Sequence, residues 1–174
     1  HTRTEISLPE LASTQLDPGT RDMDTYLDRV SREQPVRCLY DEVYLHPSLF
    51  SEDDSARDAF LLDSGRTALA TGGNIADHEQ TLLAALSMDA EDLTAIVDAR
   101  TLGTTLSLSV LGALYQSVMV SRVLGLRPRD AMALISLSGI DPTTSAADHV
   151  DLLDLSERLR AAGWSIDELR YVLD

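Results

Sequence analysis

The chain has 174 residues, a formal net charge of −15 at pH 7 and a pI near 4.4. Such an acidic surface repels phosphate backbones and anionic lipids, so we expect no nucleic-acid partner, and no apolar run approaches the roughly 20 residues that direct membrane insertion requires. Hydrophobic residues make up 44% of the chain and aromatic residues only 5%, which favours an all-α fold with a real core.

The N-terminal part of the chain, 1–74, predicts an arm and a small helical unit. The stretch 1–21 carries two prolines and shows neither helical nor strand periodicity, so we expect an extended arm. Within 22–74, apolar residues at helical spacing predict two short helices, one ending before Pro35 and one stopped at His46-Pro47. This part of the chain is therefore expected to form its own small packing unit.

A short β-hairpin is the only strand pairing that the sequence predicts. The apolar runs at 59–63 and 67–71 flank Ser64-Gly65-Arg66, a turn-forming sequence. A plain loop is the alternative. Gly72-Gly73 lacks the lysine and hydroxyl of a phosphate-binding loop and is interpreted as a flexible joint.

Three helix-pair repeats are predicted over 75–174. The apolar run from Ser107 predicts a long central helix that ends at Leu124, because Gly125 can take the left-handed conformation that closes a helix. Pro128 then suits the first turn of the next helix, and so short a link predicts a packed helical hairpin.

The same joint recurs at a fixed spacing. Leu86, Leu124 and Ala162 are evenly spaced, and their period of about 38 residues lies in the range of helical-pair repeats. Ser165 with Glu168 predicts a capping box, and Trp164 is expected to plug a helix end. The predicted structural joint residues are Leu86, Met88, Asp89, Asp92, Leu124, Gly125, Leu126, Pro128, Gly163, Trp164, Ser165 and Glu168.

Residues that could perform chemistry do not converge in the sequence. His46, His78 and His149 show no paired spacing for zinc, and Ser64 lacks the glycines of a nucleophile elbow. The single cysteine, Cys38, precedes an apolar residue and is expected to be a buried structural thiol. We therefore predict no catalytic residue, no metal and no cofactor.

Four stretches together resemble a known family. They are LYDEVYLHP at 39–47, LSMDAEDLTAIV at 86–97, the run at 106–142 and LRAAGWSIDELRYVLD at 159–174. They look like the helical region of the A subunit of bacterial Tc (ABC-type) insecticidal toxin complexes, the virulence-plasmid A protein family. The similarity covers about Tyr26 to the end.

The resemblance implies a fragment of a much larger chain. In this family a secreted or cell-surface homo-oligomer, typically a pentamer, forms a helical shell around a channel that enters the host membrane and delivers a toxic enzyme carried by the B and C subunits. This segment would belong to the non-catalytic shell and contact other domains and protomers of the same subunit. Carboxylates across such contacts would repel when ionised, which suggests a pH trigger.

Two other classes of function stay open. The first is a free-standing α-helical repeat module whose groove binds a peptide or a host protein. The second is an enzyme whose site forms only in three dimensions.

Overall fold

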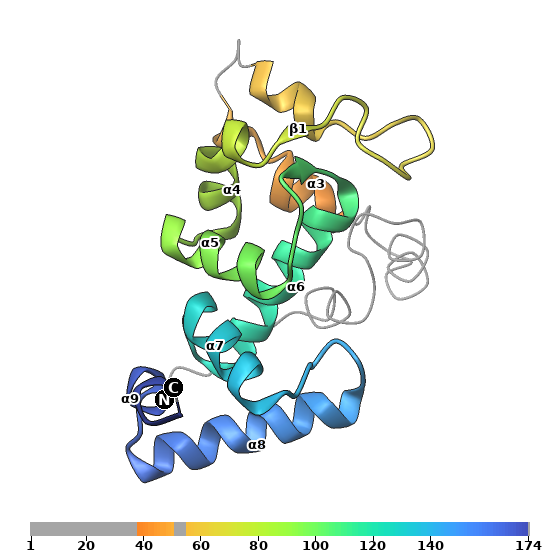
Figure 1. The fold of residues 1–174 in the computed structure, drawn as a ribbon. Helices are drawn as coiled ribbons and strands as arrows, with labels where there is room; N and C mark the ends of the chain where they lie inside the picture. The colour runs from red at the N-terminus through yellow and green to blue at the C-terminus, as the bar shows by residue number, and fades with distance from the viewer. Residues whose placement is uncertain (1–37, 51–54, 174) are drawn as a thin grey trace.

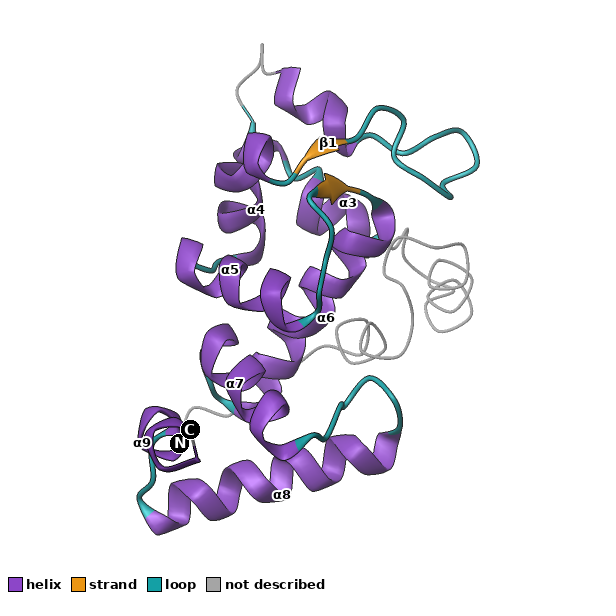
Figure 2. Ribbon diagram, in the orientation of Figure 1, coloured by secondary structure: helices purple, strands orange, loops and turns teal. Residues whose placement is uncertain are grey.

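The computed structural model describes residues 38–50 and 55–173, and within them the fold is mainly helical, as predicted (Figures 1 and 2). The predicted arm at 1–21 and the helix expected before Pro35 lie outside the described residues. In chain order the elements are α3 (Leu39–Tyr44), η1 (Pro47–Leu49), η2 (Ser55–Phe60), β1 (Gly73–Asn74), η3 (Ala76–His78), α4 (Glu79–Leu86), α5 (Ala90–Ala99), β2 (Thr105–Leu106), α6 (Leu108–Leu124), α7 (Pro128–Ser138), α8 (Ala146–Ala162) and α9 (Ile166–Leu173).

Helix α6 runs through the middle of the molecule and is buried on most of its circumference (Figure 1). Leu111 and Leu114 are fully buried, and Met119 is 2% exposed. A helix that is apolar nearly all round must be covered on several sides, which explains its central place. Its buried hydroxyls stay satisfied, because Ser117 and Ser121 donate to carbonyls of their own helix.

An aromatic cluster attaches the N-terminal described unit to α6. The hydroxyl of Tyr44 donates to the Leu111 carbonyl at 2.7 Å, and the hydroxyl of Tyr40 donates to the Phe60 carbonyl at 2.8 Å. Burial raises the pKa of Tyr40, so this hydroxyl stays a donor. Cys38 is only half-buried at the start of α3, so the expectation of a buried thiol is wrong.

The two-stranded sheet lies elsewhere than predicted. Strand β1 pairs antiparallel with β2, with Gly73 opposite Leu106. The two runs expected to form a hairpin do meet, but through a single antiparallel bridge between Leu62 and Leu69, and the first run begins inside the 3-10 helix η2. The prediction that this hairpin is the only strand pairing is therefore wrong.

Gly73 has a steric role in this sheet. A Cβ at this position would lie 2.7 Å from Nε2 of His78, which is closer than side-chain atoms approach one another. The missing side chain therefore lets β1 pass directly over the His78 ring at the start of α4.

Helices α6 and α7 turn sharply rather than folding back. Their axes bend by 88° at the link, so the two helices pack at a corner near a right angle and do not lie alongside each other as the expected hairpin. A short link with one left-handed residue produces such corners, as in helix-turn-helix units. Among the described residues no single helix is long and apolar enough to cross a bilayer, and only this bent pair meets that test when its two helices are combined.

Helices that are not consecutive also lie side by side. Helix α5 packs against α7 and α7 packs against α9, while α8 packs against α6. In Figure 1 the α8–α9 pair lies at the end of the molecule opposite β1. The second helix of each pair therefore contacts the second helix of the next pair, and the core cluster extends from these helices through α6 to Tyr40, Tyr44 and Phe60.

Candidate functional site

The three joints between paired helices share one backbone geometry. Each first helix ends with a residue of positive φ: Ser87 at 53°, Gly125 at 65° and Gly163 at 76°. At each joint this residue donates to the carbonyl three positions back, and the following residue donates to the carbonyl five positions back. This pair of bonds is the Schellman motif, which satisfies helix-end carbonyls. The bonded pairs are Ser87 to Ala84 with Met88 to Leu83, Gly125 to Arg122 with Leu126 to Ser121, and Gly163 to Arg160 with Trp164 to Leu159.

The second helices begin with different caps. Asp89 and Asp92 form a reciprocal capping box at the start of α5, and Ser165 and Glu168 form one at the start of α9. Hydrogen bonds from Ser165 lower the pKa of Glu168. Helix α7 has no side-chain cap and instead places Pro128 in its first turn, where the missing N–H costs nothing.

Two arginines connect consecutive pairs in the same way. Nη2 of Arg122 donates to the Leu86 carbonyl at 3.2 Å, and Nη2 of Arg160 donates to the Leu124 carbonyl at 2.8 Å. Each arginine lies 36 residues after its acceptor, and the two arginines are 38 residues apart in the sequence. Each cation therefore meets the negative end of the preceding pair's first helix. The sequence prediction does not include these arginines, although they share the spacing of the joints.

Asp92 connects α5 to α7 as well as capping its own helix. One carboxylate oxygen accepts from the Asp89 N–H at 3.4 Å, and the other accepts from the Arg129 N–H at 3.1 Å. Asp92 is 5% exposed. The Arg129 guanidinium also pairs with Glu91. Asp92 thus supplies a buried acceptor for the uncapped start of α7.

The third joint is more exposed than the other two. Leu86 is 1% exposed and Leu124 is 3% exposed, whereas Ala162 at the equivalent position is exposed. Met88 and Leu126 are half-buried, but Trp164 is 46% exposed. The expected plug at Trp164 is therefore wrong, because no described element covers that side of the joint.

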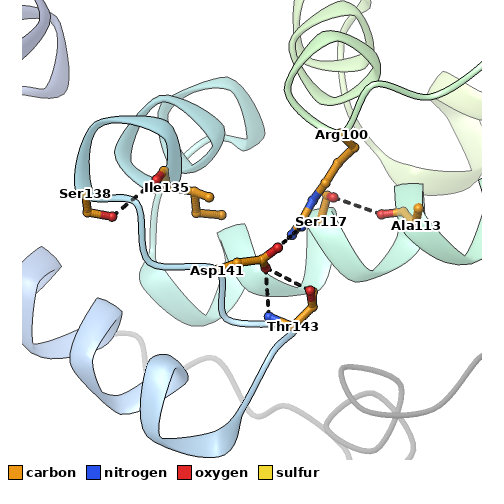
Figure 3. A network of polar contacts seen from close by, with 7 residues as sticks. All are labelled: Arg100, Ala113, Ser117, Ile135, Ser138, Asp141 and Thr143. Carbon is orange, nitrogen blue, oxygen red and sulfur yellow. Dashed lines mark hydrogen bonds and ion pairs between the residues drawn. The ribbon is translucent and has the colours of Figure 1, made fainter.

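A polar cluster holds the loop between α7 and α8 against α5. Figure 3 shows Arg100 reaching from the end of α5 to Asp141, with a distance of 2.8 Å between Nη1 and the carboxylate. The other oxygen of Asp141 accepts from the N–H and the hydroxyl of Thr143. Desolvation raises the pKa of Asp141, but these hydrogen bonds outweigh it and leave the pKa below its usual value. The cluster fixes where α8 begins relative to α5.

A groove runs between the outer faces of α5 and α7. Its volume is about 580 Å³, and its walls carry small and apolar side chains with Asp98 exposed at the rim. The lining residues are Glu91, Thr94, Ala95, Asp98, Ala99, Arg129, Met132, Ala133, Ser136 and Leu137. The groove therefore combines small and apolar walls with the Glu91–Arg129 ion pair and the Asp98 carboxylate.

The residues weighed for chemistry lie apart in the fold. His46 caps η1 through Nδ1, His78 packs edge-on against Phe60, and His149 lies on α8. Within 38–50 and 55–173 no group of three His, Cys, Asp or Glu side chains is arranged to hold a metal ion. The structure therefore brings the joint residues, not the histidines, into connected sets.

Searches against protein-family models, curated proteins and solved structures find no match to this chain.

Proposed function

We propose that this chain is a non-catalytic structural segment, built from evenly spaced helix pairs, in the helical shell of a secreted toxin-translocation subunit. The subunit would be of the Tc A type that the sequence resembles. Its partners would be neighbouring domains and protomers of a pentameric homo-oligomer, with the B and C subunits contacted only through the assembly. The site of action would be outside the bacterium or at its surface.

The equivalent pair of arginine bonds carries the repeat proposal. Arg122 and Arg160 each reach back to the last residue of the preceding pair's first helix in the same register. Repeats that contact mainly their neighbours form stacks whose length and curvature follow from the repeated joint. Such a stack suits a protein that keeps other domains at a set separation.

The buried link at Asp92 supports the same proposal. It joins the start of α5 to the start of α7 by a bond to the backbone, and α7 in turn packs against α9. The α5 and α7 helices are therefore connected by polar as well as apolar contacts. A row held in this way resists sliding of one pair over the next, which a shell requires.

Electron microscopy of the full product of the gene that encodes this chain tests the shell proposal. We expect a reading frame that continues for many hundreds of residues on both sides, and a ring-shaped oligomer whose wall contains this segment around a channel. A short reading frame, or a monomer without a channel, would rule the shell out.

The groove between α5 and α7 favours a second candidate, a module that binds a helical peptide. Its small wall residues admit an apolar helix face, and Asp98 at the rim favours a basic residue beside it. Replacing Ala133 by Trp fills the groove. If the module is the function, this variant loses a peptide partner that the wild-type chain binds, while shell assembly of the full gene product would be unchanged.

A further inference from the structure

The outer side of α8 and the α8–α9 joint form the free end of the stack of described helices (Figure 1). Large apolar side chains are exposed there: Val150 is 59% exposed, Trp164 is 46% exposed and Tyr171 is 89% exposed. Single exposed apolar residues are ordinary, but these three all belong to the last described helix pair, with Val150 on α8, Trp164 at the joint and Tyr171 on α9. We call this surface the end face; it comprises Val150, Asp151, Asp154, Glu157, Ala162, Trp164 and Tyr171.

The equivalent positions of the preceding helix pair are buried. Helix α8 packs on α6, and Gly112, Met119 and Leu124 of α6 are buried. Their equivalents on α8, one repeat later, are all exposed; they are Val150, Glu157 and Ala162. Positions that are buried on the first helix of the second pair are therefore exposed at the equivalent places on the first helix of the third pair.

The backbone at the third joint has the same acceptor as the other two. The Schellman bonds of Gly163 and Trp164 give the Ala162 carbonyl the same position relative to its helix end as the carbonyls of Leu86 and Leu124. The Leu86 and Leu124 carbonyls each accept a hydrogen bond from an arginine 36 residues later. Among the described side chains no arginine makes this contact to Ala162. The arginine contact is thus present twice, and Ala162, the residue at the third equivalent position, is exposed.

We propose that the end face is a docking surface for one further helix pair of the same polypeptide, in the register of the earlier pairs. The first helix of that pair carries an arginine 36 residues after Ala162, as at the two earlier joints, and this arginine donates to the Ala162 carbonyl. This inference uses the helix-pair stack proposed above, but it does not depend on the chain being part of a toxin shell.

The charge of the end face specifies the partner further. Asp151, Asp154 and Glu157 follow one another at three-residue steps along the exposed side of α8. Nη2 of Arg158 lies 3.9 Å from a carboxylate oxygen of Asp154, and the Arg158 side chain is 80% exposed. One exposed arginine does not balance three carboxylates, so this row stays acidic. The docking helix therefore presents basic residues along its length and an apolar patch opposite Trp164 and Tyr171.

Hydroxyl-radical footprinting read by mass spectrometry tests the docking. The oxidation rate of Trp164 is compared between this 174-residue chain and the longer product of the same gene. Covering a side chain that is now 46% exposed is expected to lower its oxidation rate roughly fivefold in the longer product. Tyr115, which is 3% exposed, is the control for folding and stays protected in both proteins.

The arginine proposed 36 residues after Ala162 allows a second comparison of Trp164 oxidation. Replacing it by Ala in the longer product should return part of the oxidation at Trp164 while Tyr115 stays protected. The proposal is overturned by a reading frame that stops before the arginine position, by another residue there, or by equal oxidation of Trp164 in both proteins. Protection that depends on the concentration of the 174-residue chain would also overturn it, since that protection comes from a second copy. Channel formation by the full gene product is a separate observation, so either proposal can fail alone.

Discussion

Nη2 of Arg160 donates to the backbone carbonyl of Leu124 at 2.8 Å, and this bond joins the last turn of α8 to the last turn of α6. Arg122 makes the matching contact with Leu86 at 3.2 Å, so α6 is joined to α4 in the same way. A cation at the carboxyl end of a helix is favoured by the helix dipole as well as by the bond itself. Consecutive pairs are therefore linked at equivalent atoms, and a change at either link should affect both pairs that it joins.

Replacing Arg160 by Ala should lower the free energy of unfolding by about 1 kcal/mol, because a charge-assisted bond between two pairs is lost. Arg158→Ala is the matched control two residues earlier, since its side chain is 80% exposed and its ion-pair distance is 3.9 Å. Urea unfolding followed by circular dichroism measures both. Equal effects of the two substitutions would show that the Arg160 contact contributes nothing specific.

Substitutions at the joint residues of positive φ should change the free energy of unfolding in opposite directions. Gly125→Ala should destabilise by about 1–2 kcal/mol because φ is +65°. Its added Cβ would also lie 3.3 Å from Nη2 of Arg160, whereas the same change at Gly163 meets no atom within 4 Å. Ser87→Gly should stabilise by up to about 1 kcal/mol, since Ser87 holds φ +53° with a Cβ.

Thermal unfolding of the three joint variants compares them directly. We expect Gly125→Ala to lower the midpoint more than Gly163→Ala, and Ser87→Gly to raise it. A lower midpoint for Ser87→Gly would contradict the strained conformation assigned to that joint.

Asp92 is predicted to be the most sensitive of the capping residues. Its two oxygens accept from Asp89 and Arg129, which begin different helices, and the side chain is buried. Asp92→Ala leaves both donors without this acceptor and should cost about 1–3 kcal/mol. Asp92→Asn keeps the shape but turns an amide donor toward one of the two N–H groups, so it should also destabilise the chain. Asp89→Ala, which removes a single cap, should cost about 1 kcal/mol in the same urea titration.

Helix ends can be predicted from this sequence because their signals are local. Leu124-Gly125 and Ser165 with Glu168 carry a helix end and a helix start within a few residues, so periodicity and capping chemistry locate the helices. The β1–β2 pairing cannot be predicted, because each strand has two residues and Gly73 and Leu106 are separated in the sequence by α4 and α5. The groove needs two helices to be placed side by side, which no local pattern specifies.

Exposure at the third joint cannot be predicted for a related reason. Trp164 occupies the position of Met88 and Leu126, and residue type alone favours burial there. Whether it is buried depends on a neighbouring pair rather than on its own helix. The bonds of Arg122 and Arg160 cannot be predicted from hydrophobic periodicity, because each joins a guanidinium to a backbone carbonyl that is distant in the sequence. The spacing of the two arginines is nevertheless a signal that a search for repeats could use.

The Asp141 cluster predicts part of the stability loss in acid. The pKa of Asp141 is lowered in the folded chain, so the carboxylate binds its proton less readily than in the unfolded chain. Its contribution is therefore fully present above the ordinary pKa of 3.8 and is lost as the pH falls through the lower folded value. Asp141→Asn should flatten the stability curve in that range, measured by urea unfolding at several pH values. An unchanged slope would exclude Asp141 as a contributor.

Shortening the chain after Ser138 tests most directly whether the molecule is a stack of helix pairs. Removing α8 and α9 takes away one neighbour of α6 and one of α7, while the contacts of α4, α5, α6 and α7 with one another remain. Circular dichroism during urea titration should show a shortened chain that keeps its helices and unfolds cooperatively at a lower urea concentration. Complete loss of the helical signal in the absence of urea would contradict the stack and indicate a single indivisible core.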